Sequence, residues 1–125
     1  MPIGPRANTT FWQDWVNLAL GLWLFVSPWV LGYTGLAGAA TNSWILGIAV
    51  AAVATAALIS YAQWEEWLNA VFGLWLLVSP WVIGFVGTGE ASVAPLWNHV
   101  LVGVAVAVLA LWDGLAHASA ERAPI

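Results

Sequence analysis

The chain has 125 residues, of which 62% are hydrophobic and only 6% are charged, and its formal net charge is −4 with two basic side chains. A soluble domain normally carries about 25% charged residues, so this chain could not cover its outside with solvated groups. The scarcity of cations argues against nucleic acid and against a polybasic lipid contact. The absence of cysteine excludes disulfides and thiolate chemistry.

Four apolar stretches follow one another along the chain, and each is close to the roughly 20 residues that a helix needs to cross the bilayer core. They cover about 12–33, 44–62, 65–86 and 97–117. The connections between them are short, which makes neighbouring helices antiparallel. The sequence therefore predicts an all-α membrane protein, with four transmembrane helices in a single integral membrane domain over residues 1–125.

The first stretch is repeated by the third. Residues 12–32 read WQDWVNLALGLWLFVSPWVLG and residues 64–84 read WEEWLNAVFGLWLLVSPWVIG, with 13 of 21 residues identical at an offset of 52. The second and fourth stretches correspond at an offset of 56. Each repeat is thus a helical hairpin, about 12–62 and 64–117, and the two repeats are parallel because both enter the membrane from the same side. The internal copy also argues against a cleaved signal peptide at the first stretch.

A stripe of small and polar residues lies on one face of the first stretch, opposite its tryptophans, when residues are placed about 100° apart. Glycine lets helix backbones approach closely, and a buried amide can bond across helices with about 0.6 kcal/mol. We interpret the stripe as a packing face, with a ligand-binding amide as the alternative. It is interrupted by one leucine in each copy and consists of Asn17, Gly21, Leu24, Pro28 and Gly32, then Asn69, Gly73, Leu76, Pro80 and Gly84. Its expected partners are Gly47, Ala51, Gly103 and Ala107.

The two prolines of the stripe predict a kink or an end of each helix, because proline has no N–H and clashes with the preceding turn. Ser27 and Ser79 precede them and can bond a backbone carbonyl, which softens the break. A kink used for packing is the favoured interpretation. The alternative is a broken helix whose carbonyls face an ion, as in transporters.

Eleven tryptophans predict an aromatic belt at both membrane interfaces. Trp23 and Trp75 lie deeper, where the indole N–H needs a partner. Helix or lipid packing is the favoured role for this deeper pair, and stacking on a flat apolar ligand is the alternative. One belt consists of Trp12, Trp15, Trp64, Trp67 and Trp112, and the other of Trp44 and Trp97.

The triplets Ser27-Pro28-Trp29 and Ser79-Pro80-Trp81 are each preceded by W-x-x-W-x-N-x-x-x-G-x-W-L and closely followed by a glycine. In this motif the chain resembles the SPW-repeat family of small bacterial and archaeal integral membrane proteins, over nearly its whole length. The resemblance implies a four-helix membrane domain of two hairpins and no established activity. The structural motif comprises Asn17, Gly21, Ser27, Pro28, Trp29, Asn69, Gly73, Ser79, Pro80 and Trp81.

The ionisable groups predict no catalytic, cofactor or metal site. Asp14, Glu65 and Glu66 fall in first turns, where carboxylates favour the positive end of the helix dipole. His99 and His117 are 18 residues apart, which on one helix is about 27 Å, so they cannot share a metal. Asp113 is the one acid that we expect to face inward, either as a functional group or as a group that reaches the interface.

The predicted function is therefore that of a non-enzymatic integral membrane scaffold or accessory subunit. Its partners would be the lipid bilayer and other membrane proteins or a second copy. The alternative is a small transporter or binder of an apolar ligand at the repeat interface, with Asn17, Asn69, Pro28 and Pro80 at its centre. Arg6 and Arg122 flank the termini, so the positive-inside rule predicts a multi-pass cell-membrane protein with both termini cytoplasmic.

Overall fold

The computed structural model describes residues 12–60, 62–87 and 89–122, with the backbone alone described over 117–122. This part of the chain is all-α and contains no strand. Its helices are α2 (Trp12–Val30), α3 (Ala37–Ile59), α4 (Gln63–Ser79) and α5 (Val93–Arg122). A short π-helix, η1 (Pro80–Gly84), continues α4, and a short 3-10 helix, η2 (Glu90–Ser92), precedes α5.

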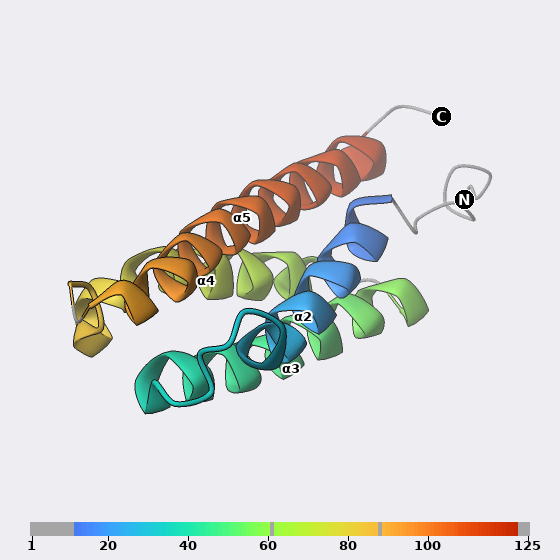
Figure 1. The fold of residues 1–125 in the computed structure, drawn as a ribbon. Helices are drawn as coiled ribbons and strands as arrows, with labels where there is room; N and C mark the ends of the chain where they lie inside the picture. The colour runs from blue at the N-terminus through green and yellow to red at the C-terminus, as the bar shows by residue number, and fades with distance from the viewer. Residues whose placement is uncertain (1–11, 61, 88, 123–125) are drawn as a thin grey trace.

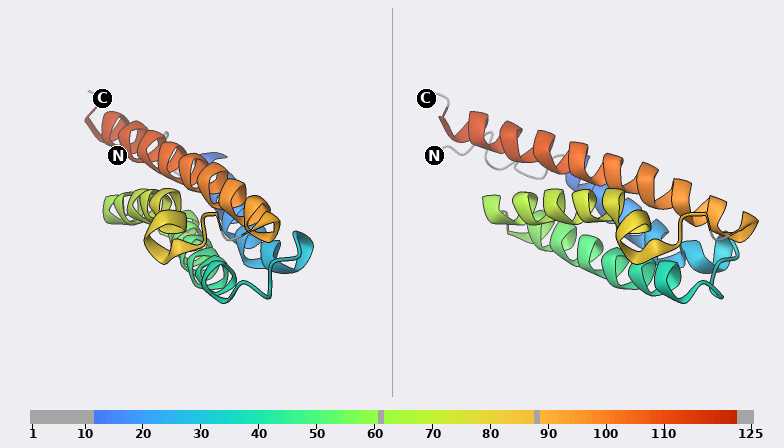
Figure 2. Two further views of the ribbon diagram at one scale, coloured as in Figure 1. Left: turned by 60° about the vertical axis from the view of Figure 1, so that its left-hand side comes forward. Right: turned by 90° about the vertical axis from the view of Figure 1, so that its left-hand side faces the viewer.

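The four long helices form an antiparallel bundle in which α2 begins and α5 ends at the same end (Figure 1). α2 packs chiefly on α3, and α4 packs chiefly on α5. Contacts of α2 with α5 and of α3 with α4 join these two hairpins into one bundle (Figure 2). The hairpins are those that the short connections predict.

Three segments are long and apolar enough to cross a membrane: Ala37–Ile59, Gln63–Gly84 and Glu90–Ala116. The prediction of spanning helices is confirmed at this level for those three. α2 has 19 residues but does not qualify, because its first two turns carry Gln13, Asp14 and Asn17. These polar side chains lower the mean hydropathy of α2, although all three are buried inside the bundle.

Two helices begin earlier than the sequence predicts. α3 begins at Ala37 and α5 at Val93, whereas the apolar stretches suggested starts near 44 and 97. Ala39 and Ala40 are fully buried against Tyr33 and Phe85, so tertiary packing extends α3 over residues that look like a turn. Residues 38–43, which the predicted stretches 12–33 and 44–62 leave as a connection, are therefore helical.

The core in the middle of the bundle is built from matching positions of the two repeats. Leu24 and Leu76 are both fully buried and lie on α2 and α4 at the 52-residue offset. Positions on α3 and α5 at the 56-residue offset complete the cluster, so the hairpins share one core. The added members are Leu46 and Val50 from α3 and Val102 and Val106 from α5.

In each hairpin, glycines allow the backbones of the two helices, α2 with α3 and α4 with α5, to come into contact. A Cβ placed on Gly21 would lie 2.6 Å from the Ala51 nitrogen and 2.9 Å from the Gly47 oxygen. A Cβ placed on Gly73 would lie 2.5 Å from the Ala107 nitrogen and 2.7 Å from the oxygen of Gly103. No side chain fits at these crossings, because the obstructing atoms belong to the facing backbone.

The prolines lie close to where their helices end. α2 continues through Pro28 and ends two residues later, whereas α4 ends at Ser79 and passes into η1 at Pro80. The predicted serine back-bonding is confirmed: the Ser27 hydroxyl donates to the Trp23 carbonyl at 2.6 Å, and the Ser79 hydroxyl donates to the Leu76 carbonyl at 3.1 Å. In α4 the serine thus bonds the carbonyl that Pro80 leaves without its backbone partner, whereas in α2 it bonds the carbonyl one residue before the one that Pro28 frees.

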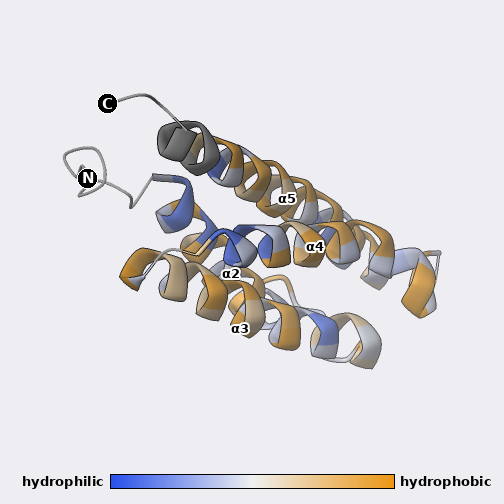
Figure 3. Cartoon of the chain, turned by 180° about the vertical axis from the view of Figure 1, so that it is seen from behind, coloured by the Kyte–Doolittle hydropathy of each residue, from blue (hydrophilic) through white to orange (hydrophobic). Residues whose placement is uncertain are grey.

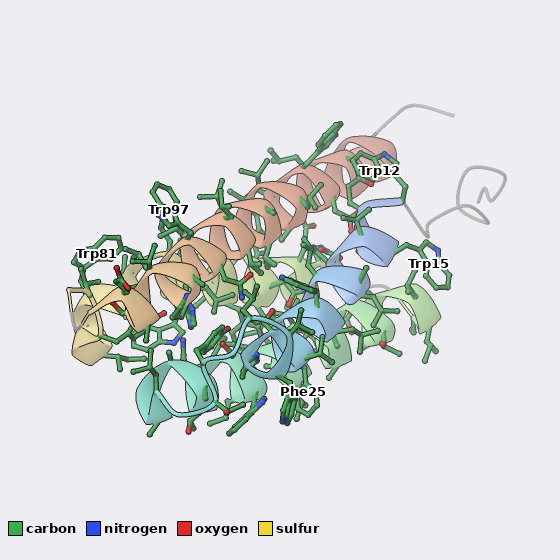
Figure 4. All side chains as sticks on the ribbon, viewed as in Figure 1. Trp12, Trp15, Phe25, Trp81 and Trp97 are labelled. Atoms are coloured by element: carbon green, nitrogen blue, oxygen red, sulfur yellow. The ribbon has the colours of Figure 1, made fainter. Side chains whose placement is uncertain are left out.

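Exposed large hydrophobic side chains occur on all four long helices, and hydrophilic residues occur where α2 and α4 begin (Figure 3). Trp12 and Trp15 project from one end of the bundle, and Trp81 and Trp97 project from the other (Figure 4). All four are more than half exposed. This distribution fits helices surrounded by lipid, with indoles near both interfaces.

Candidate functional site

Three carboxyl groups meet inside the bundle at the end where α2 and α4 begin, which we call the acidic end. Asp14 on α2, Glu66 on α4 and Asp113 on α5 each offer an oxygen, and these oxygens lie within 4.8 Å of one another. The three side chains are at most 1% exposed. We call them the carboxylate cluster.

The helix packing at the acidic end holds the carboxylate cluster together. A Cβ placed on Gly114 would lie 3.3 Å from the Glu66 Cβ, so α5 approaches α4 closely and brings Asp113 alongside. The rings of Trp12 and Trp112 meet edge to face at 5.1 Å and join α2 to α5 at the same end. The first turns of α2 and α4 also present the positive ends of their dipoles to the acids.

Asp14, Glu65 and Glu66 lie in the first turns of their helices, as the sequence predicts. Glu65 Oε1 accepts from the Ala62 N–H at 2.8 Å, whereas Asp14 and Glu66 are buried in the carboxylate cluster. The prediction that Asp113 faces inward is confirmed, because it is fully buried. The prediction of no metal site did not take the carboxylate cluster into account.

Buried amides lie one helical turn deeper than two of the acids. Asn17 follows Asp14 on α2 and Asn69 follows Glu66 on α4, each three residues on and at most 1% exposed. Neither amide atom of Asn17 has a hydrogen-bond partner, and the Asn69 Oδ1 has none. An unsatisfied buried polar group costs about 1–3 kcal/mol of folding stability. Asn17 and Asn69 would therefore destabilise the fold if packing were their only role.

A second polar network lies at the opposite end, near the 31–36 and 85–92 connections. The Trp23 indole N–H donates to Asn98 Oδ1 at 2.9 Å, and the Trp75 indole N–H donates to Asn42 Oδ1 at 2.9 Å. Each bond joins one repeat to the other. The deeper tryptophans thus find amide partners within the protein, in agreement with the packing interpretation.

The two halves of this network differ in detail. Asn42 Nδ2 donates to the Ser79 hydroxyl at 3.0 Å, whereas Asn98 Nδ2 donates to the Tyr33 hydroxyl at 3.2 Å. The Tyr33 hydroxyl also lies 2.7 Å from the Ser43 hydroxyl. Burial raises the pKa of Tyr33, so the phenol stays protonated and keeps this contact at neutral pH.

His99 is a core residue of the same end. Its Nδ1 lies 2.8 Å from the Pro95 carbonyl and its ring 5.2 Å from that of Phe85. The side chain of His117 and the basic side chains of Arg6 and Arg122 fall outside the described residues. His99 belongs to α5 near its start, and it does not join the carboxylate cluster at the far end of that helix.

The predicted structural motif divides between the interior and the surface. Its amide, glycine, serine and proline positions are buried in both repeats. Trp29 and Trp81 are more than half exposed, so they face the bundle's surroundings. The buried members are Asn17, Gly21, Ser27, Pro28, Asn69, Gly73, Ser79 and Pro80.

A sequence signal for the carboxylate cluster exists in the repeat itself. Asp14 and Glu66 occupy the same position of the repeated segment at the 52-residue offset. Residues that share a repeat position face the common axis in the same way, so two acids there predict a meeting point. Asp113 has no such counterpart, because Ala57 stands 56 residues before it.

The fold and its buried polar sites define an all-α membrane protein whose two hairpins share one core. Residues 11–113 match the SPW repeat domain, and the chain therefore belongs to the SPW repeat family. No curated protein matches the chain, and no solved structure matches it.

Proposed function

We propose that the chain is a non-enzymatic integral membrane scaffold or accessory subunit of the cell membrane. All four long helices would span the bilayer as two parallel hairpin repeats, with both termini in the cytoplasm. α2 would span with its polar first turns inside the bundle. Its 19 residues correspond to about 28 Å, which suits a hydrocarbon core of about 30 Å.

The observation that carries the proposal is an apolar groove on the outer face of the first hairpin. It has a volume of about 590 Å³ and runs between α2 and α3, with Phe25, Ala52 and Thr55 in its lining. The Thr55 hydroxyl donates to the Ala51 carbonyl at 2.8 Å, so its hydrogen is turned away from an incoming partner. The groove is shaped by small residues on a lipid-facing helix.

Two groove positions on α3 carry larger side chains in the second hairpin, whereas Leu18, Phe25 and Ile48 correspond to the smaller Ala70, Leu77 and Val104. Val108 stands where the first hairpin has Ala52, and Leu111 stands where it has Thr55. Small residues on a membrane helix let a second helix approach closely. The difference between otherwise similar hairpins therefore supports a partner helix that packs on α2 and α3.

Native mass spectrometry of the protein, extracted in mild detergent or native nanodiscs, tests the proposal. We expect a defined additional membrane subunit or a homo-oligomer. The variant Ala52→Val/Thr55→Leu, which copies the second hairpin, should lose that association, whereas Val104→Ile on the exposed face of α5 should keep it. A strictly monomeric wild type with no interactor would contradict the proposal.

The alternative is a transporter or apolar-ligand binder at the repeat interface, and it has weaker support. Asn17, Asn69, Pro28 and Pro80 are buried, and Leu24 and Leu76 fill the core between the repeats. The variant Asn69→Leu distinguishes the scaffold function from ligand binding at the repeat interface. Loss of ligand binding with normal expression would favour the alternative, and a change in stability alone would favour packing.

A further inference from the structure

We propose that the carboxylate cluster of Asp14, Glu66 and Asp113 binds one hard divalent cation of the Mg²⁺, Ca²⁺ and Mn²⁺ class. The amide oxygens of Asn17 and Asn69 would supply the adjoining ligands on its inner side. This site lies inside the bundle at the acidic end, and it is independent of the groove on the first hairpin.

The spacing of the carboxylate oxygens suits one ion. Hard divalent cations bind oxygen at about 2.0–2.6 Å, so two oxygens on the same ion lie at most about 5 Å apart. The three carboxylate oxygens lie within 4.8 Å of one another. They come from three different helices, and an ion among them would tie α2, α4 and α5 together.

Charge compensation is the second argument. Three carboxylates side by side in a buried site cannot all be ionised without a compensating charge. The chain has only two basic residues, Arg6 and Arg122, and neither side chain is within the part of the chain that the structure describes. A divalent cation compensates two of the three negative charges, and one shared proton compensates the third.

The buried amides point independently to a ligand. Asn17 is fully buried with neither amide atom hydrogen-bonded, and the Asn69 Oδ1 lacks a partner. Each follows an acid of the cluster by three residues on the same helix face. Helical side chains lean toward the N-terminus of their helix, so both amides lean toward Asp14 and Glu66.

The donor set selects the class of cation. Carboxylate and amide oxygens suit Mg²⁺, Ca²⁺ and Mn²⁺, whereas Zn²⁺ and Cu²⁺ favour imidazole or thiolate. The chain has no cysteine, and His99, the histidine whose side chain the structure describes, lies at the opposite end of α5. Since Ala57 replaces the acid at the matching position of the first repeat, the cluster predicts one site per chain.

Mn²⁺ titration of the chelator-treated full chain in detergent tests the site, with free Mn²⁺ followed by electron paramagnetic resonance. We expect saturable binding of one ion per chain and a higher melting temperature with Mn²⁺. Glu66→Gln and Asp113→Asn should each abolish binding, and Asn17→Ala should weaken it about tenfold or more. Glu65→Gln is the matched control, because this acid is buried next to the cluster but bonds to the Ala62 N–H.

Two results would overturn the proposal. One is the absence of saturable Mn²⁺ binding by the wild type, which would leave proton sharing as the way the cluster is neutralised. The other is binding by Glu66→Gln or Asp113→Asn that equals binding by the wild type. Folding of both variants is checked by size exclusion and melting, and the Mn²⁺-dependent melting of the wild type gives a readout that needs no variant.

Discussion

Trp23 and Trp75 show how single side chains join the two repeats. Each indole N–H donates to an asparagine of the other hairpin at 2.9 Å, and both bonds lie at matching positions of the repeat. Inside a membrane an unbonded N–H finds no water, so these partners keep the deep tryptophans in one orientation. Trp29, near the end of α2, faces outward instead, with 57% exposure.

A double-mutant cycle of Trp23→Phe and Asn98→Ala measures the contribution of one such bond. We expect a coupling of about 0.6 kcal/mol and at most about 1.7 kcal/mol, the range of interhelical hydrogen bonds in membrane proteins. Reversible unfolding in mixed micelles gives the stabilities. The same cycle with Trp29→Phe should give no coupling, and equal coupling in both cycles would contradict the role assigned to Trp23.

Glycine crossings decide how the helices pair within each hairpin. Gly21 meets Gly47 and Gly73 meets Gly103 at distances that leave no space for a Cβ. The stripe of small residues was visible in the sequence, because a helical period places it on one face. Its partner residues were also inferable, but the closeness of the contact depends on how the two backbones cross.

Gly73→Ala should destabilise the protein by about 1–3 kcal/mol, because the new methyl group would lie 2.5 Å from the backbone nitrogen of Ala107 and force the helices apart. Thermal unfolding in detergent measures the effect. Gly35→Ala is the control, since a Cβ there meets nothing within 4 Å. Equal stability of the two variants would show that α4 and α5 can separate freely.

Helix boundaries were the least predictable feature of the elements. The segment 38–43 contains glycine and polar residues and resembles a turn, yet it is helical. Asn42 and Ser43 bond to side chains on other elements, so they do not compete for their own backbone. The Asn42 partner, Trp75, lies 33 residues away in the sequence, and a local pattern cannot reveal it.

Three segments of the molecule have the length and hydropathy of membrane spans. The remaining long helix, α2, carries polar residues in its first turns. α2 hides those turns within the bundle, where Asp14 and Asn17 are at most 1% exposed. A hydropathy average weighs these residues as though they faced lipid, although they lie inside the bundle. In the proposed topology, α2 would span the membrane only as part of the assembled bundle.

Single cysteines test this topology, because the chain contains none. We place them at Trp12, Thr34 and Ser60, which are exposed at the start of α2, after α2 and after α3. A membrane-impermeant maleimide should label Thr34→Cys from one side of oriented vesicles, and Trp12→Cys and Ser60→Cys from the other, cytoplasmic side. Labelling of Trp12→Cys from the same side as Thr34→Cys would show that α2 does not span.

The sequence by itself determined the membrane-like, all-helical class, the hairpin plan, the packing stripe and the SPW motif. Those features depend on composition, helical period and repetition, which are local or self-similar properties of the chain. Only the tertiary structure decided which polar residues meet. Asp14, Glu66 and Asp113 lie far apart in sequence, and Asp113 has no repeat counterpart, so the carboxylate cluster exists only where three packed helices place its members side by side.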